Sequence, residues 1–180
     1  MDIDPDALQY EAFKETLRVR DFDSGSKDLD DFLNTEEVEA YEDEGLGRTT
    51  LVFYRGELVA YFTTSFDGLR VEYLKTWKSF TRLAEFKLEV VPAVKIGRLA
   101  VQRAWQSKGI GRHLIRWVAG MALELGGTSG VRLLIVQAKK ESIPFYEKCG
   151  FQLTVETKRE RKRENNRTMF FDLHSIADVA

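Results

Sequence analysis

The residues best suited to chemistry lie between Arg98 and Arg112, where an apolar stretch gives way to a loop that opens directly onto a helical pattern. A loop in this position points unpaired backbone N–H groups at one spot, and the helix dipole adds partial positive charge there. Gly109 and Gly111 allow an oxygen atom to approach the backbone closely, and Lys108 adds formal positive charge, as does Arg112. The pattern predicts an anion site, although an ordinary glycine-containing helix start has the same letters.

Two common phosphate-binding motifs can be compared with this loop. A Walker A loop needs a glycine placed four residues before a Gly-Lys-Ser/Thr run, and the sequence contains none. A dinucleotide-binding Gly-x-Gly-x-x-Gly motif that starts at Gly109 would need a third glycine at position 114, which is Leu114. Both motifs are absent, so the loop must bind its anion in another way.

The elements around this loop alternate between helices and strands. Apolar residues at helical spacing predict helices over residues 21–45, 68–89, 109–125 and 142–149. Runs rich in β-branched and aromatic residues predict strands over residues 49–54, 58–65, 94–101, 131–138, 151–155 and 169–173. Arg55-Gly56-Glu57 separates the first two strands, which favours a hairpin. The order predicts a mixed α/β domain with helices on both faces of one sheet.

Two helix boundaries carry specific signals. The acidic helix of residues 21–45 is expected to begin at Ser26 or Asp28, because either side chain can accept a hydrogen bond from the first free amides. The helix over 109–125 is expected to end at Gly126-Gly127, since glycine commonly follows the last helical turn.

Length and composition limit the class of protein. The chain has 180 residues, 43% of them hydrophobic, and we expect a single domain over 1–180. One cysteine, Cys149, excludes a disulfide framework and a multi-thiolate zinc site, and His113 and His174 are too far apart in sequence for a helical metal-binding pair. No apolar run has the ~20 residues of a membrane span, and the acidic N-terminus does not look like a signal peptide. We therefore expect a cytoplasmic, metal-free protein.

The net charge of −2 hides two segments of opposite sign. Residues 21–45 contain eleven acidic side chains and one lysine, which is most simply a solvated helix face. Residues 156–168 contain six basic and three acidic side chains. The basic segment fits either a charged hairpin or a surface that meets nucleic-acid phosphates.

The run Gln106 to Gly111 reads Gln-x-x-Gly-x-Gly and follows a strand that ends in Arg98-Leu99-Ala100-Val101. This run resembles the acyl-CoA pyrophosphate loop of the GNAT superfamily of N-acetyltransferases. Downstream, VRLLIVQA is similar to the fifth strand of that family, and the run from Phe145 to Phe151 is similar to its Phe-Tyr-x-x-x-Gly-Phe ending. The three motifs occur in the family's order.

The beginning of the chain resembles one branch of this superfamily. Phe22-Asp23-Ser24-Gly25, followed by Leu29-Asp30-Asp31-Phe32-Leu33, is similar to the opening of GNAT proteins that include toxins of toxin–antitoxin modules, some of which acetylate aminoacyl-tRNA. The resemblance covers most of residues 20–173. It implies a mostly antiparallel mixed sheet whose fourth strand (94–101) splays from the fifth (131–138) to receive acetyl-CoA.

The resemblance also implies roles for individual residues. Leu99, Ala100 and Val101 would present backbone groups to the cofactor, with the Val101 amide polarising the thioester carbonyl. The pyrophosphate would be bound mainly by main-chain amides, with side-chain support from Lys108 and Arg112. This predicted cradle consists of Gln106, Ser107, Lys108, Gly109, Ile110, Gly111 and Arg112.

Tyr146 is the predicted general acid. The phenol of tyrosine has a pKa of ~10, so it is protonated at neutral pH and can deliver a proton to a departing thiolate. The alternative is a tyrosine that only packs its helix onto the sheet, but Phe145 is suited to that task and Tyr146 would face another direction.

No general base is evident in the sequence. Glu72, Glu85 and Glu89 are more simply surface carboxylates, and a water relay or a neutral amine would remove the need for a base. Two positions depart from the family pattern: Gln137, which is often acidic in the toxin-like branch, and Lys139, where many members have asparagine.

The sequence leaves the acceptor open. The first hypothesis is transfer of an acetyl group from acetyl-CoA to a primary amine, with the acceptor molecule unspecified. A second is a toxin that acetylates aminoacyl-tRNA, with the 156–168 segment on the RNA and an antitoxin as partner, and a third is a non-catalytic acyl-CoA-binding module. A homodimer is also compatible with exposed aromatic residues such as Trp77, Phe80 and Trp105.

Overall fold

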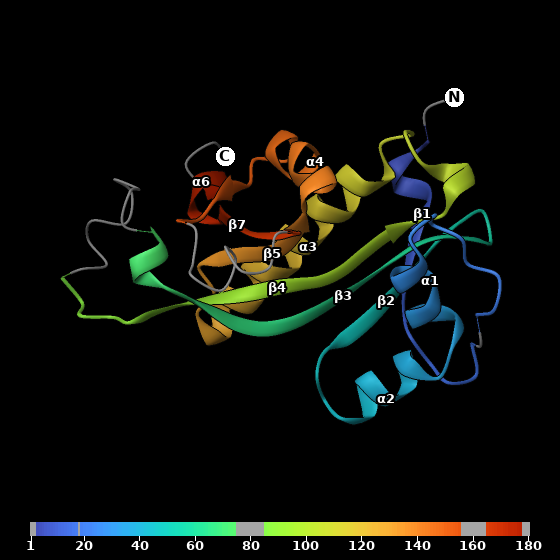
Figure 1. Ribbon diagram of the computed structural model, residues 1–180, viewed down its shortest axis with the longest axis horizontal. Coiled ribbons are helices and arrows are strands. Elements are labelled where there is room, and N and C mark those ends of the chain that lie inside the picture. The colour runs from blue at the N-terminus through green and yellow to red at the C-terminus, as the bar shows by residue number, and fades with distance from the viewer. Residues whose placement is uncertain (1–2, 18, 75–84, 156–164, 178–180) are drawn as a thin grey trace. The chain divides into compact units, whose positions relative to one another are not determined.

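The computed structural model describes residues 3–17, 19–74, 85–155 and 165–177. Its strands form a seven-stranded sheet in the order β1-β2-β3-β4-β5-β7-β6 (Figure 1). The strands are β1 (Leu8–Ala12), β2 (Arg48–Tyr54), β3 (Glu57–Arg70), β4 (Val90–Val101), β5 (Leu133–Lys139), β6 (Gln152–Leu153) and β7 (Asn166–Asp172). The helices are α1 (Lys27–Asn34), α2 (Glu37–Asp43), α3 (Ile110–Ser129), α4 (Ile143–Lys148) and α6 (His174–Ala177).

The strand pairings confirm the predicted mixed, mostly antiparallel sheet. β1 pairs with β2, β2 with β3, β5 with β7 and β6 with β7, all in antiparallel orientation. The neighbours β4 and β5 run parallel. None of the helices within the described ranges has both the length and the apolar character needed to cross a bilayer.

The chain divides into two compact units, each made of two stretches of sequence. The first unit consists of residues 1–65 and 96–117, and the second of residues 66–95 and 118–180. That residues 1–180 act as a single domain stays a prediction.

The core of the first unit lies between α1, α2 and the strands of that unit. Its buried members are Phe22, Phe32, Leu33, Val38, Leu51, Tyr61 and Ala100. The ring of Tyr61 is fully buried, but its hydroxyl donates a hydrogen bond to the Leu29 carbonyl at 2.7 Å, so no polar atom of that side chain is left unpaired. Burial raises the pKa of Tyr61, and the phenol therefore remains neutral.

The core of the second unit joins the first half of β4 to β5 and β7. Its buried members are Leu69, Leu74, Val91, Ala93, Leu133, Ile135 and Phe170. At the start of β5, Arg132 donates two hydrogen bonds to the Asp172 carboxylate, at 2.7 and 2.8 Å. The Arg132 amide also donates to the Pro92 carbonyl at 3.0 Å, which links the start of β5 to β4.

The predicted hairpin is confirmed, with strands longer than expected. Tyr54 pairs with Glu57, which leaves Arg55 and Gly56 as a two-residue turn. Both turn residues have positive φ, 51° and 81°, as a tight turn between right-twisted strands requires. β3 continues to Arg70, well beyond the expected end at residue 65.

The prediction of one helix over residues 21–45 is wrong, because two helices are present. Thr35 is extended, and its hydroxyl accepts a hydrogen bond from the Glu37 amide at 3.2 Å, which starts α2 anew. The preceding residue, Asn34, exchanges hydrogen bonds with both backbone groups of Phe22 at 2.8 and 3.0 Å. The polar side chains at 34 and 35 therefore satisfy the loop instead of continuing the helix. Ser26 is the N-cap residue as expected, although its side chain makes no capping hydrogen bond.

The expected end of the central helix is also wrong. α3 runs through Gly126 and Gly127 to Ser129, and Gly130, with φ of 66°, ends it. A Cβ at position 126 would lie 3.3 Å from the Val131 carbonyl oxygen, so Gly126 serves close packing of the returning chain. Gly130, rather than Gly126 or Gly127, therefore ends the helix.

The helix predicted over 68–89 is wrong at both ends. Residues 68–70 belong to β3, Val71–Leu74 form a 3₁₀ turn, and β4 begins at Val90, before the expected residue 94. Residues 75–84 lie outside the described part of the chain, as do Trp77 and Phe80. Strand β1, with five residues and a weak pattern, was not predicted.

Gly47, at the start of β2, allows a test of this packing. A Cβ there would lie 2.4 Å from the Tyr41 hydroxyl and 2.7 Å from the Thr64 carbonyl. We expect Gly47→Ala to lower the free energy of unfolding by about 1–3 kcal/mol, as measured by denaturant titration. The matched control is Gly120→Ala in α3, where a Cβ meets nothing within 4 Å and alanine should be neutral or stabilising by about 1 kcal/mol. Equal stability of the two variants would contradict this account.

Candidate active site

The last residues of β4 alternate between the core and the opposite face. Ala100 is buried against α1 in the first-unit core, whereas Leu99 and Val101 are partly buried. Successive residues of a strand point to opposite faces, so the two residues beside Ala100 point away from that core. The Val101 carbonyl accepts a hydrogen bond from the Gln106 side chain at 3.0 Å, which ties the strand end to the loop that follows.

The loop between β4 and α3 has an irregular backbone. A 3₁₀ turn over Arg103–Trp105 is followed by Ser107 and Gly109, both in the left-handed region with φ of 60° and 84°. A serine in that region costs roughly 1 kcal/mol or more, so the surrounding contacts must hold it there. A Cβ at Gly109 would meet nothing within 4 Å, so the space in front of this residue is open.

Three backbone amides of this loop are free to bind a ligand. The N–H groups of Ser107, Lys108 and Gly109 donate to no backbone carbonyl or side chain in the described part of the chain. They precede α3, a helix of 20 residues whose N-terminus carries the positive end of its dipole. Unpaired amides at such a helix start, with open space before them, form a cradle for a phosphate or similar anion.

The side chains around the cradle differ in what they contact. The Gln106 amide nitrogen donates to the Ser24 carbonyl at 2.7 Å and to the Val101 carbonyl, so this side chain braces the loop. Lys108 Nζ donates to the Ala104 carbonyl at 2.8 Å and lies 4.5 Å from the centre of the Trp105 ring. Ile110 is buried, and Arg112 is exposed. The cradle is therefore made of backbone, and Arg112 is its freely exposed cation.

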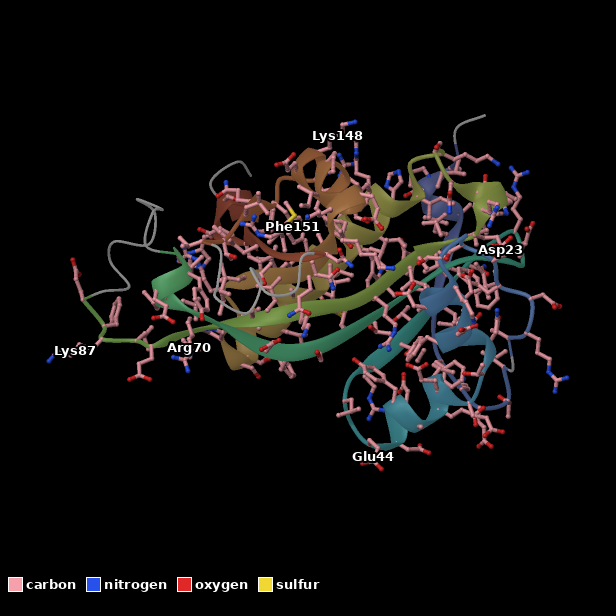
Figure 2. The ribbon with its side chains drawn as sticks, in the orientation of Figure 1. Asp23, Glu44, Arg70, Lys87, Lys148 and Phe151 are labelled. Carbon is pink, nitrogen blue, oxygen red and sulfur yellow. The ribbon has the colours of Figure 1, made fainter. Side chains whose placement is uncertain are left out.

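A set of contacts from the early part of the chain supports this loop and was not predicted. The Asp23 amide (Asp23 is labelled in Figure 2) donates to the Gln102 side chain at 2.8 Å, and the Arg103 amide donates to the Asp23 carbonyl at 2.7 Å. The Asp23 carboxylate also pairs with the Arg103 guanidinium at 3.1 Å. Gly25, with φ of 84°, packs against that guanidinium. The Phe22–Gly25 motif was the available signal, but the sequence alone did not show its partner.

Tyr146 belongs to the second unit and lies on α4. Its side chain is 9% exposed and makes edge-to-face contacts with Phe145 and Phe151, with ring centres 5.0 and 5.4 Å apart. Tyr146 is more buried than Phe145, so the expectation that only Phe145 packs is wrong. Burial raises the pKa of Tyr146 to about 12, and its hydroxyl makes no hydrogen bond to the described residues. The phenol is therefore a protonated donor without a protein partner.

The short helix α4 is held by the residues that follow it. Gly150 has φ of 91°, and a Cβ there would lie 3.0 Å from the Phe171 ring. The Phe151 amide then donates to the Tyr146 carbonyl at 3.0 Å (Phe151 is labelled in Figure 2). Glycine at 150 is thus required both for the turn and for the close approach of β7.

The remaining predicted residues lie at the surface or beyond the described ranges. Glu72, Glu85 and Glu89 are all exposed, as expected of surface carboxylates. Gln137 is exposed on β5 opposite Thr168, and Lys139 ends that strand. Residues 156–164, which hold most of the basic segment, lie outside the described part of the chain.

Comparison with known proteins supplies the chemistry of this anion cradle. The sequence profile of the acetyltransferase (GNAT) family matches residues 10–151. A tRNA-acetylating toxin of Mycobacterium tuberculosis is 26% identical over 137 residues, which are 76% of this chain and 79% of that protein.

Two solved structures share the fold. AtaT complexed with acetyl-methionyl-tRNAfMet superposes with a TM-score of 0.78 and 22% identity, covering 96% of this chain and 98% of that one. A mutant AtaT toxin bound to acetyl-CoA and to the C-terminus of the antitoxin AtaR gives a TM-score of 0.71 and 24% identity, covering 96% and 97%.

The free amides at residues 107–109 and the open space at Gly109 fit the diphosphate of acetyl-CoA, the acyl donor of this family. With most of its length matched, the chain belongs to the GNAT family of acetyltransferases and is an acetyl-CoA-dependent N-acetyltransferase.

Proposed function

We propose that this enzyme acetylates the α-amino group of an aminoacyl-tRNA, with acetyl-CoA as the donor. Acetyl-CoA as the donor is supported by one observation: in the described part of the chain, the amides of Ser107, Lys108 and Gly109 before α3 are unpaired. The acceptor is supported by the relatives: one is named a tRNA-acetylating toxin, and another was solved with an acetylated aminoacyl-tRNA. Small-molecule amines, which the first hypothesis from the sequence also allows, become the alternative to be tested.

In this proposal the cradle of residues 106–112 binds the diphosphate of the donor. The amides of Ser107, Lys108 and Gly109 face no protein acceptor, and those of Ile110 and Gly111 open the helix behind them. Arg112 adds an exposed cation. Gln106 contributes by bracing, because its side chain is already bonded to Ser24 and Val101.

Acetyl-CoA supplies an activated acyl group whose thiolate leaves readily. We assign the backbone amide of Val101 to hold the acyl carbonyl oxygen, with Leu99 and Ala100 presenting the rest of the strand backbone to the cofactor. Tyr146 Oη holds the proton that goes to the departing sulfur. A pKa of about 12 keeps this hydroxyl protonated at every physiological pH, as a general acid requires.

A dedicated general base is not needed for this acceptor. An α-amino group has a pKa of about 7.7–8.0, so a substantial fraction is already the neutral nucleophile near neutral pH. This agrees with the exposed positions of Glu72, Glu85 and Glu89, none of which is built into a site. The proton lost on attack goes to solvent.

The proposal also assigns partners and place. Lys158, Arg159, Arg161, Lys162, Arg163 and Arg167 of the basic segment would meet tRNA phosphates. Because the AtaT relative was solved with an antitoxin, we extend the proposal to an antitoxin partner. Aminoacyl-tRNA places the reaction in the cytoplasm.

The acceptor is tested with purified enzyme, radiolabelled acetyl-CoA and total aminoacyl-tRNA. We expect label in the tRNA fraction, and mild alkali, which cleaves the aminoacyl ester, should release it as N-acetyl amino acid. Uncharged tRNA and free amino acids are the controls and should remain unlabelled. Turnover on a panel of small amines with none on charged tRNA would show that the acceptor is a small molecule. Binding of acetyl-CoA without turnover on any acceptor would show that the protein is a non-catalytic acyl-CoA-binding module.

Tyr146→Phe tests the general acid. We expect kcat to fall about 10²–10⁴-fold, the usual contribution of such a group, while the melting temperature changes little because the ring contacts with Phe145 and Phe151 remain. Unchanged kcat would remove Tyr146 from the mechanism.

The pH dependence of the wild type gives a second check. Since burial raises the pKa of Tyr146 to about 12, ionisation of this phenol should not lower kcat between pH 7 and 10. The raised pKa also means that its contribution to stability is complete below the ordinary pKa of ~10 and is lost as pH rises from there towards 12. A loss of activity near pH 10 that is absent in Tyr146→Phe would show that the pKa of Tyr146 is not raised.

Gln106→Ala tests the cradle. Removing two hydrogen bonds that hold the loop should raise the Kd for coenzyme A roughly 5–150-fold by calorimetry, since each is worth about 0.5–1.5 kcal/mol. Gln9→Ala, an exposed glutamine on β1, is the matched control and should leave the Kd unchanged. The idea fails if the two variants bind coenzyme A equally well.

A further inference from the structure

Gly97 and Arg98 of β4 both lie near Tyr41 of α2, just before the residues assigned to the cofactor. A Cβ at Gly97 would lie 3.7 Å from the Tyr41 hydroxyl, and the Arg98 guanidinium lies 5.3 Å from the centre of the Tyr41 ring. Tyr41 and Arg98 therefore form one polar cluster beside this part of the strand.

Arg98 is held in one orientation but has hydrogen bonds to spare. Its guanidinium carbon lies over the Phe32 ring, 3.7 Å from the ring centre, and Nη2 donates to the Glu37 carboxylate at 2.9 Å. The side chain is 26% exposed, and no other hydrogen bond joins it to the described residues. A guanidinium fixed at one end presents its remaining N–H groups to oxygen acceptors in a rigid plane.

Tyr41 is the second polar group at this spot, after Arg98. Its ring packs edge-on against Phe32, with centres 5.5 Å apart, and within the described ranges its hydroxyl makes no hydrogen bond. Gly47 and Gly97 lie near that hydroxyl, at positions where a Cβ would come within 2.4 and 3.7 Å of it. The phenol is therefore closely packed by backbone but has an unused donor.

A buried hydroxyl points to a ligand or water at the same place. Thr63 is 0% exposed, and its Oγ1 lies 2.9 Å from the Cβ position of Gly97 without a hydrogen-bond partner. Thr49, directly opposite Thr63 in the sheet, has an equally buried and unpartnered hydroxyl. Such groups normally have a partner, and leaving one unpaired costs about 1–3 kcal/mol.

We propose that Arg98 and Tyr41 bind the acceptor through its oxygens: Tyr41 donates to the aminoacyl ester carbonyl, and Arg98 donates to the adjoining ribose or phosphate oxygens. The inference rests on the proposed function, since it assigns the recognition of that same acceptor. Arg98 is three residues from Val101, which is roughly 10 Å along a strand. The distance between Val101 and Arg98 suits an acceptor whose amine lies at the acyl group near Val101 and whose ribose lies near Arg98.

Arg98→Lys and Tyr41→Phe test the proposal by steady-state kinetics with aminoacyl-tRNA. We expect the acceptor KM to rise about 10–100-fold for Arg98→Lys and about 3–10-fold for Tyr41→Phe, from the loss of charge-assisted and neutral hydrogen bonds respectively. The Kd for coenzyme A, measured by calorimetry, and the melting temperature should stay at wild-type values. Arg70→Lys, an exposed arginine in the second unit, and Tyr10→Phe, which keeps its stacking on Trp117, are the matched controls.

The outcomes separate this inference from the function on which it rests. Active wild type with unchanged acceptor KM in both variants overturns the inference alone. A parallel loss of coenzyme A affinity or of melting temperature would give these residues a structural role and would also overturn it. A wild type that transfers no acetyl group to aminoacyl-tRNA overturns both.

Discussion

Three consecutive amides of the β4–α3 loop have no acceptor among the residues that the structure describes, and the contacts around the loop hold it in that conformation. A free loop would turn these donors to its own carbonyls, as backbone groups ordinarily do. Here the left-handed Ser107 and Gly109 aim them outwards, and the strain at Ser107 is offset by the Gln106 hydrogen bonds. Asp23, in the distant N-terminal segment, fixes the start of the loop through its hydrogen bonds with Gln102 and Arg103.

The two tyrosines with strongly raised pKa show how similar burial serves different ends. Tyr61 is fully enclosed and its hydroxyl is bonded to the Leu29 carbonyl, so it strengthens the first-unit core. Tyr146 is nearly as buried, but its hydroxyl has no partner in the described part of the chain. Within the described ranges only the Tyr146 hydroxyl keeps a proton that no residue engages, and this observation supports its proposed role as the general acid.

Motifs and strong periodicity were sufficient to predict the sheet, the hairpin and the order of most elements. The residues of β2, β5 and α4 are strongly apolar or have clear turn signals, and their positions were predicted to within a few residues. Boundaries that depend on tertiary contacts were not predicted correctly. The break at Thr35 depends on the hydrogen bonds between Asn34 and Phe22, and the continuation of α3 depends on the packing of Gly126 against Val131. Hydrophobic periodicity carries no information about such tertiary contacts.

The same limit applies to the site. The resemblance implied that Gln106 and Lys108 belong to the cradle, yet the side chain of Gln106 braces the loop and that of Lys108 bonds to the Ala104 carbonyl. The contribution of Asp23 was hidden because its partners lie about 80 residues away. Arg98 and Tyr41 were not singled out, since they are far apart in the sequence and only the fold brings them together.

In the proposed function, the eleven carboxylates of residues 21–45 affect how a nucleic acid would approach Arg98. Double-stranded RNA is a dense line of negative charge, and it would be repelled by the acidic surface on which Glu37 pairs with that arginine. A duplex laid along α1 and α2 would therefore be disfavoured, whereas a single-stranded end that carries few phosphates would meet less repulsion.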